Sequence, residues 1–276
     1  MTQATDFRQR TVLITGASLG VGAAAARAFA ARGANLVLLA RGQAGLETLA
    51  QELDLKDRTM TAALDVTDLD AFAALLAEIE TRFGALDVLV NNAGFHARGP
   101  VETIPPEDIG RMVDVNLKAP LVATRLALPY LRRAAQPAVI NVASLAGRTA
   151  LPDSATYSAT KFGLRVFGLA LAEELRGTGI KIASVSPGPI DTGFIMDDID
   201  GVSDLTFSQP ISTAEQVAEA IVDLVTNAAT EQPMPRMSGY LTTISYLFPA
   251  LGRALRPALQ RKGQRTKERL KRERSP

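Results

Sequence analysis

A tyrosine and a lysine four residues apart are the residues whose types and spacing most directly suggest chemistry. Tyr157 and Lys161 stand near the start of a stretch rich in Ala and Leu at helical spacing. Positions i and i+4 lie on the same face of a helix, so the Lys161 ammonium can sit beneath the Tyr157 phenol. A nearby positive charge favours the phenolate, and a tyrosine tuned in this way can act as a general acid or base.

Two further polar residues follow apolar runs that are typical of buried strands. Ser144 comes just after Val139–Val142, and Asn92 comes just after Val88–Val90. The carboxyl ends of parallel strands form the ligand-binding edge of an open α/β sheet. We therefore expect Ser144 near Tyr157, where its hydroxyl could stabilise a carbonyl oxygen that gains negative charge.

Each of these side chains also has an ordinary structural explanation. Ser144 could cap a helix, Asn116 could be a polar residue within a helix, and Lys161 could be a solvated surface charge. Their occurrence together in one chain favours a catalytic interpretation over the separate structural ones.

A glycine-rich segment joins the first predicted strand to an alanine-rich helix. Residues Thr15–Gly22 read Thr-Gly-Ala-Ser-Leu-Gly-Val-Gly. Glycines in this position allow a tight turn and a close approach of the backbone to a phosphate, and the helix N-terminus offers free N–H groups. The segment predicts a dinucleotide pyrophosphate site, and a plain strand-to-helix turn is the alternative.

The second predicted strand ends at Arg41, which bears on the choice of cofactor. An acidic residue at this point would bind the ribose hydroxyls of NAD, whereas an arginine accommodates the 2′-phosphate of NADP. No acid stands there, and a guanidinium suits a phosphate bidentately. Arg41 therefore favours NADP(H) over NAD(H), unless it is only a solvated surface residue.

Composition excludes several classes of site. The chain has no cysteine and a single histidine, His96, so disulfides, thiolate chemistry and a multi-histidine metal centre are excluded, and we expect no metal. A Ser-His-Asp hydrolase would depend on His96, to which we assign no catalytic role because a lone loop histidine is more often structural.

Strand-like and helix-like segments alternate along the first 226 residues. Strands are expected at Val12–Thr15, Leu36–Leu39, Thr59–Leu64, Val88–Val90, Val139–Val142 and Ile182–Val185. Helices are expected at Ala23–Ala31, Gln43–Leu53, Leu69–Phe83, Glu107–Arg133, Ser154–Arg176 and Thr213–Thr226. This alternation predicts an α/β fold with a single Rossmann-type, doubly wound parallel sheet and helices on both faces.

The pattern weakens toward the C-terminus. Residues 192–211 have no period and are expected to form a long loop or a short lid helix, and Glu231–Ser238 contains two prolines and makes at best a short edge strand. We expect a Rossmann-type domain over residues 1–238 and a basic amphipathic helical extension over residues 239–276.

The extension combines an apolar stripe with strong positive charge. Its apolar residues recur at helical spacing: Ile244, Leu247, Phe248, Leu251, Ala254, Leu255, Ala258 and Leu259. Pro249 could open this helix, and Pro257 should kink or restart it. Residues 251–276 carry a net charge of +8, which leaves −7 on the other 250 residues. Peripheral contact with an anionic membrane, packing on the body or on a partner subunit, and a mobile solubilising tail are all open.

Other interaction classes are less favoured. No window holds about 18 consecutive apolar residues, so no membrane-spanning helix is expected. The first ten residues lack the apolar run of a secretion signal, and we expect a cytoplasmic protein. Because the positive charge is confined to the extension, the body does not have the evenly basic face of a nucleic-acid binder, and no nucleic acid is expected.

Taken together, these motifs resemble those of the short-chain dehydrogenase/reductase family, in its NADP-preferring branch. The resemblance covers roughly residues 8–230 and rests on segments that stand in the family's order and spacing: Thr15–Gly22, Asn91–Gly94, Asn116, Ser144, Tyr157, Lys161, Pro187 and Gly188. It departs from the family's NADP pattern at Leu19, where a basic residue is common.

The resemblance implies a role for each matched residue. Asn116, Ser144, Tyr157 and Lys161 resemble the catalytic tetrad, in which Lys161 also orients the nicotinamide ribose and Asn116 holds a water that links Lys161 to solvent. The implied cofactor-binding residues are Gly16, Ser18, Leu19, Gly20, Gly22, Arg41, Asp65, Val66, Asn92, Ala93, Gly94, Tyr157, Lys161, Pro187, Gly188, Ile190 and Thr192. Among these, Asp65 and Val66 resemble the adenine contact, and Pro187, Gly188 and Thr192 resemble the nicotinamide side.

The implied function is an NADP(H)-dependent oxidoreductase that transfers a hydride between the nicotinamide and a carbonyl or secondary alcohol. Phe194, Ile195, Met196 and Phe207 favour a lipophilic substrate, and family members often form homodimers or homotetramers. Two alternatives stay open: a 3-oxoacyl thioester reductase, and a regulatory protein that binds the cofactor without turnover.

Overall fold

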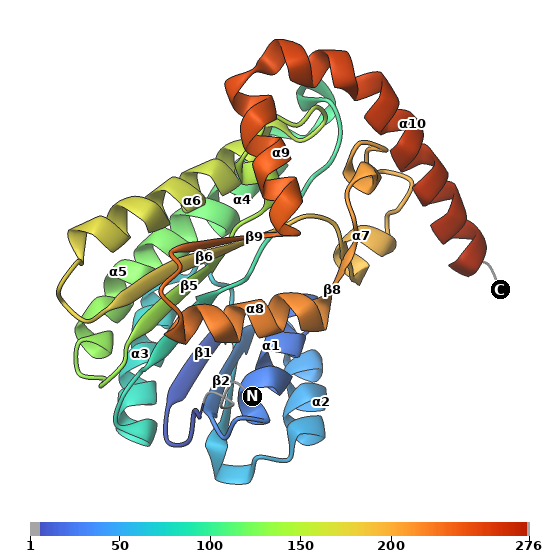
Figure 1. Cartoon of the computed structure of the whole chain (residues 1–276). Helices are drawn as coiled ribbons and strands as arrows, with labels where there is room; N and C mark the ends of the chain where they lie inside the picture. Colours follow the sequence, from blue (N-terminus) through green and yellow to red (C-terminus); the bar gives the residue numbers. More distant parts are fainter. Residues whose placement is uncertain (1–5, 275–276) are drawn as a thin grey trace.

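A parallel sheet of seven strands forms the centre of the chain (Figure 1). The structure is a computed structural model that describes residues 6–274. The first five residues, which are part of the N-terminal segment where no secretion signal is expected, lie outside the described residues. In sheet order the strands are β3 (Thr59–Ala63), β2 (Asn35–Ala40), β1 (Thr11–Thr15), β4 (Val88–Asn91), β5 (Ala138–Val142), β6 (Lys181–Pro187) and β9 (Glu231–Met234). A small parallel pair, β7 (Ile190–Asp191) and β8 (Ser212–Thr213), lies apart from it.

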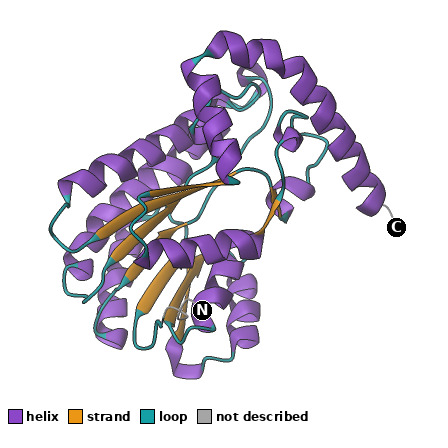
Figure 2. Ribbon diagram, in the orientation of Figure 1, coloured by secondary structure: helices purple, strands orange, loops and turns teal. Residues whose placement is uncertain are grey.

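Helices cover both faces of the sheet, as Figure 2 shows. One face carries α1 (Gly20–Ala30), α2 (Gln43–Leu53) and α8 (Ala214–Thr226). The other carries α3 (Leu69–Phe83), α5 (Ala119–Leu131) and α6 (Ala155–Glu174). Because successive strand side chains point to opposite faces, β1 buries Val12 and Ile14 in one apolar core and Leu13 in the other. The predicted doubly wound sheet is confirmed.

The winding direction reverses between β1 and β4. The chain runs outward from β1 through β2 to β3, and then returns to place β4 on the other side of β1. Such a reversal opens a crevice at the carboxyl ends of the two central strands, which is where open α/β sheets bind ligands.

The long helix predicted over Glu107–Arg133 is interrupted. The chain forms α4 (Pro106–Val113), a π-helical segment (Asp114–Lys118) and then α5. The wider π turn takes in an extra residue without ending the helix, a device frequent at functional sites. Asn116 lies within this turn and is fully buried.

The C-terminal extension forms two helices where the sequence pattern predicts one stripe. They are α9 (Arg236–Leu247) and α10 (Pro249–Arg274), and the expected domain boundary after Ser238 falls inside α9. The break comes at Phe248, because the residue before a proline is disfavoured in the helical conformation. Pro249 opens α10 as expected, and α10 continues through Pro257, so the helix does not restart there.

These two helices, residues 236–274, are called the arm below. In Figure 1 the arm rises beside the sheet, bends and descends past α7 (Gly193–Met196). Lys267 Nζ donates to the carbonyl oxygens of Asp200 (3.1 Å) and Val202 (2.7 Å), and Leu270 packs on a small apolar cluster beneath. Within residues 6–274, no helix is long and apolar enough to cross a membrane.

A charged network joins the last strand of the sheet to its surroundings. The half-buried Glu231 carboxylate accepts two hydrogen bonds from Arg165 (2.6 and 2.8 Å), one from Ser186 (3.2 Å) and one from Arg148. Arg148 also donates to Thr243 Oγ1 of α9 (2.9 Å). Burial raises the pKa of Glu231, but the hydrogen bonds and charges of the two arginines outweigh it and hold the pKa below its ordinary 4.5.

We expect Glu231→Gln to lower the free energy of unfolding by about 3 kcal/mol, because two partly buried arginines lose their counter-charge. Since folding lowers the Glu231 pKa, the wild-type contribution is full above pH 4.5 and is lost as the pH falls through the folded-state value. Urea unfolding of both proteins at several pH values measures this; equal stability at neutral pH would contradict it. Glu219→Gln, at an exposed ion pair with Arg32, is the control.

Candidate active site

One cavity of about 1190 Å³ opens at the carboxyl edge of the sheet and extends to the inner side of the arm. Of the residues that the sequence predicts for the site, those that line this cavity are Gly16, Ser18, Leu19, Gly20, Arg41, Asp65, Val66, Asn92, Ala93, Gly94, Ser144, Tyr157, Lys161, Pro187, Gly188, Ile190 and Thr192. The other two, Gly22 and Asn116, are buried residues that do not line the cavity. The fold thus brings segments from the whole length of the first 192 residues to one place.

The glycine segment forms a backbone-lined cradle. Gly16 has a φ of +67°, and a Cβ there would lie 2.9 Å from Ala93 Cα. A Cβ on Gly22 would lie 2.1 Å from the carbonyl oxygen of Gly16, so neither position tolerates a side chain. Asn92 Nδ2 closes the turn by donating to the carbonyl oxygens of Thr15 (2.9 Å) and Gly16 (3.1 Å). The cradle fits the pyrophosphate of a dinucleotide at the start of α1.

Opposite charges lie at the far end of this cradle. Asp65 accepts hydrogen bonds from the backbone N–H (2.9 Å) and hydroxyl (2.8 Å) of Thr67. Burial raises the pKa of Asp65, but these bonds and the charges of Arg41 and Arg111 hold it below its ordinary value, so the carboxylate is ionised. Ser18 lies against Gly45 in the first turn of α2, which has no acidic residue. This corner can accept both an adenine and an additional phosphate.

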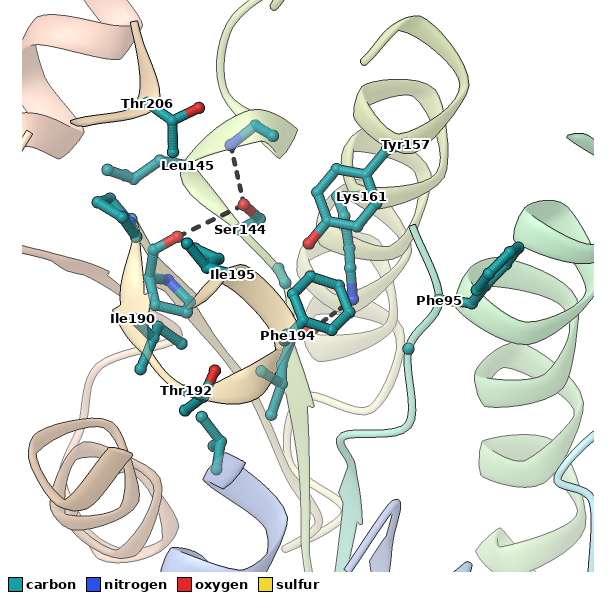
Figure 3. Close-up of a pocket in the computed structure, with 18 of the residues that line it drawn as sticks. Phe95, Ser144, Leu145, Tyr157, Lys161, Ile190, Thr192, Phe194, Ile195 and Thr206 are labelled. Atoms are coloured by element: carbon teal, nitrogen blue, oxygen red, sulfur yellow. Dashed lines mark hydrogen bonds between the residues drawn. The ribbon is translucent and has the colours of Figure 1, made fainter. Parts of the chain in front are cut away.

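Ser144 and Tyr157 face the cavity from two different elements (Figure 3). Ser144 caps a short 3₁₀ turn (Leu145–Gly147) after β5: its Oγ accepts from the N–H of Ala146 (3.1 Å) and donates to the carbonyl oxygen of Pro187 (3.4 Å). The cap explanation and the catalytic one are therefore compatible. Figure 3 shows the Tyr157 hydroxyl, from the first turn of α6, pointing to the side of the cavity where Ser144 lies.

Burial governs the protonation of the tyrosine and the lysine. Lys161 Nζ lies 5.8 Å from the centre of the Tyr157 ring and donates to the carbonyl oxygen of Val142 (2.9 Å). Burial lowers the pKa of Lys161 to about 8. Burial also raises the pKa of Tyr157, although a hydrogen bond with Ser144 and the charge of Arg98 act against it. In the free protein desolvation of the phenol is therefore the largest effect, and the lowering of the phenol pKa by the ammonium together with a bound oxidised nicotinamide stays a prediction.

Asn116 secures the loop that follows β4. Its Oδ1 accepts from the N–H of Phe95 (2.7 Å), and its Nδ2 donates to the carbonyl oxygen of the same residue (2.7 Å). A Cβ on Gly94 would lie 3.6 Å from Asn116 Oδ1 and 3.8 Å from Lys161 Nζ, so these two groups approach the same side of Gly94. The π turn therefore holds an amide next to the buried ammonium.

The structure adds His96 to the neighbourhood of the tyrosine. Its ring stacks on Tyr157 with centres 4.0 Å apart and planes 15° apart. Burial lowers the pKa of His96 to about 3, and the charges of Arg98 and Lys161 act in the same direction, so the imidazole is neutral. In the sequence His96 stands just after Asn91–Gly94, but no local pattern indicates that its ring covers Tyr157.

Residues of the arm also line the cavity, which the sequence did not indicate. Leu241 and Ile244 contribute from α9, and Leu251, Leu255 and Leu259 contribute from α10. The apolar stripe of the extension predicts a helix with an apolar face, but it does not predict which part of the protein that face packs on.

Comparison with known proteins agrees with this geometry. The family model described as short chain dehydrogenase matches residues 10–201. Dehydrogenase/reductase SDR family member 7B of Bos taurus is 32% identical over 276 aligned residues, which cover 94% of this chain and 84% of that protein. Ketoacyl reductase HetN of a Nostoc strain is 34% identical over 229 residues, with 82% and 79% covered.

A solved structure extends the similarity to three dimensions. The crystal structure of a short-chain dehydrogenase/reductase from Brucella melitensis, titled glucose/ribitol dehydrogenase, superposes with a TM-score of 0.76 at 30% identity. The match covers 83% of this chain and 95% of that one. With the cradle, the Tyr157–Lys161 pair and Ser144 in one cavity, the chain belongs to the short-chain dehydrogenase/reductase family of oxidoreductases.

Proposed function

We propose that this chain is an NADP(H)-dependent oxidoreductase that interconverts a carbonyl group and a secondary alcohol on an apolar substrate. The observation that carries the proposal is the convergence of Ser144, Tyr157 and Lys161 in the same cavity as the glycine cradle and Arg41. A cofactor bound along the cradle would reach from Arg41 toward the tyrosine.

The nicotinamide, when bound, exchanges a hydride with the reacting carbon. The residues handle the proton and the charge on oxygen: Tyr157 donates its phenolic proton to the developing alkoxide and takes it back in the oxidation direction. The Ser144 hydroxyl donates a hydrogen bond to the same oxygen. Because burial favours the neutral phenol, Tyr157 holds its proton until that oxygen gains charge.

Lys161 and Asn116 support the tyrosine. With a pKa of about 8, the buried Lys161 is mostly protonated at neutral pH and stabilises the phenolate left after proton transfer. It is also placed to orient a nicotinamide ribose, and Asn116 can hold a water that links Lys161 to solvent.

Two features support NADP(H) over NAD(H). Arg41 and Ser18 line the cavity beside the N-terminus of α2, where free N–H groups and a guanidinium both attract a phosphate. No carboxylate stands at the end of β2 to bind ribose hydroxyls in its place.

The cavity favours an apolar substrate. Its apolar lining includes Leu145, Leu151, Phe194, Ile195 and Leu205, and the centre of the Phe194 ring lies 6.5 Å from that of Tyr157. A second candidate is a 3-oxoacyl thioester, because a relative that is 34% identical is named a ketoacyl reductase and Arg256 at the arm side could pair with a phosphate of the thioester carrier. Comparing turnover of lipophilic ketones with that of a 3-oxoacyl thioester decides between them.

Tyr157→Phe should reduce turnover of a carbonyl substrate at least about hundredfold, because the ring still packs but the transferable proton is gone. NADPH affinity, measured by fluorescence titration, should change only a few-fold. Tyr130→Phe on α5, outside the cavity, should leave turnover unchanged. Retention of more than about a tenth of wild-type turnover by Tyr157→Phe would exclude Tyr157 as the acid or base. Absence of turnover in the wild type across a broad carbonyl panel would favour a regulatory protein.

Arg41→Asp should change the cofactor preference from NADPH to NADH, because a phosphate partner is removed and an acceptor for ribose hydroxyls is installed. A charge-assisted hydrogen bond is worth about 1.5–3 kcal/mol, so the KM for NADPH should rise at least about tenfold. Steady-state kinetics with both cofactors measure this, with Arg125→Asp on α5 as the control. A wild-type preference for NADH would show that Arg41 does not select the cofactor.

A further inference from the structure

The arm exposes many large apolar side chains, two of them at its bend. Leu247 and Phe248, on either side of the end of α9, are 63% and 61% exposed. Further exposed large apolar side chains of the arm are Met237, Tyr240, Leu241, Ile244, Tyr246, Leu251 and Leu255. Large contiguous apolar patches are rare on free protein surfaces and mark interaction sites.

This surface is continuous with the interior of the cavity. Leu241, Ile244, Leu251 and Leu255 are exposed to solvent and also line the cavity. The same four side chains therefore contact solvent and also contribute to the cavity wall where α9 and α10 border it. Among the arm residues that line the cavity, Arg256 is the one with a charged side chain.

Helix α10 is strongly basic. Residues 251–276 hold ten Lys or Arg and two Glu. At about 100° per residue, Arg261 and Arg265 fall on the side opposite Leu259 and the buried Gly263, and Arg253 falls on the flank of that side. All three are exposed, and none forms an ion pair within residues 6–274. Unpaired basic residues beside an apolar patch are the features that draw an amphipathic helix to an anionic lipid surface.

We infer that the arm docks on an anionic lipid bilayer, with Leu247 and Phe248 inserted among the lipids and the arginines on the headgroups. An apolar substrate then enters the cavity between α9 and α10 directly from the bilayer; this second part rests on the proposed function. Self-association through the same face would bring two regions of charge +8 together, which charge repulsion disfavours.

Sedimentation with vesicles tests the docking without cofactor or substrate. The full chain is mixed with vesicles of phosphatidylcholine alone, or of phosphatidylcholine with phosphatidylglycerol, at low and at high salt. We expect binding to the anionic vesicles at low salt and its loss at high salt, because salt screens exposed charges. A chain that stays in the supernatant with anionic vesicles at low salt overturns the proposal.

Two variants assign the binding to the arm. Changing Arg253, Arg261 and Arg265 together to Gln should weaken binding about a hundredfold, since each arginine near an anionic surface contributes about fivefold. The matched control changes three exposed basic residues outside the arm, Lys56, Arg125 and Arg132, and should leave binding within a few-fold of the wild type. Equal losses in both variants would overturn the assignment.

Substitutions at the bend test the contribution of the apolar side chains to vesicle binding. Leu247→Ser with Phe248→Ser should abolish vesicle binding while the thermal unfolding temperature stays unchanged, and Val166→Ser on α6, where Val166 is 53% exposed, is the control. Light scattering of the same proteins tests whether the apolar face instead binds a second copy of the chain. If the wild type is a dimer that only the bend variant dissociates, and vesicles are not bound, then the face belongs to a second copy and the proposal is wrong.

Substrate entry is tested by two ketones. A long-chain methyl ketone is carried in the vesicles and cyclohexanone is dissolved in the buffer. The bend variant should raise the KM for the vesicle-borne ketone alone; an equal change for both would overturn entry from the bilayer. If neither ketone nor any other carbonyl is reduced by the wild type, the proposed function fails, while the sedimentation result still decides the docking.

Discussion

The tie between the ends of β1 and β4 is the contact on which the site depends. The sheet reverses its winding between these strands, so the two loops that leave their carboxyl ends would otherwise diverge. Thr15 Oγ1 accepts from the N–H groups of Asn92 and Ala93, both at 3.0 Å, and the Asn92 amide donates back to the glycine segment. A Cβ at Gly16 or Gly22 would collide with backbone atoms. Glycine at these two positions therefore allows both the close approach of the two loops and the phosphate cradle.

Desolvation sets the chemistry of the neighbouring catalytic corner. Lys161 is buried and Tyr157 is partly buried between β5, α6 and the loop after β4, and His96 covers one face of the tyrosine ring. Each of the three has its pKa moved toward the neutral form. The free protein thus keeps a proton on the phenol. Negative charge that develops on oxygen during the reaction is stabilised mainly by Lys161 and by a hydrogen bond from Ser144.

The arm connects stability with access to the cavity. Its base is held where Arg148 joins Glu231 of β9 to Thr243 of α9, and its far end is held where Lys267 meets the carbonyl oxygens near Asp200. Between these attachments lies the bend at Phe248. The arm is thus attached on both sides of the bend, and apolar side chains between these attachments line the cavity.

The sequence by itself determined the strands, most helix limits, the glycine cradle and the Tyr157–Lys161 pair, because these follow from local sterics, side-chain periodicity and i to i+4 spacing. It placed Ser144 at the correct edge through the rule for parallel strands. Only the tertiary structure brought His96 onto Tyr157, inserted the π turn at Asn116 and turned the apolar stripe of the arm toward the cavity. Those outcomes depend on contacts between residues far apart in the chain, and on desolvation that such contacts create, which no local pattern encodes.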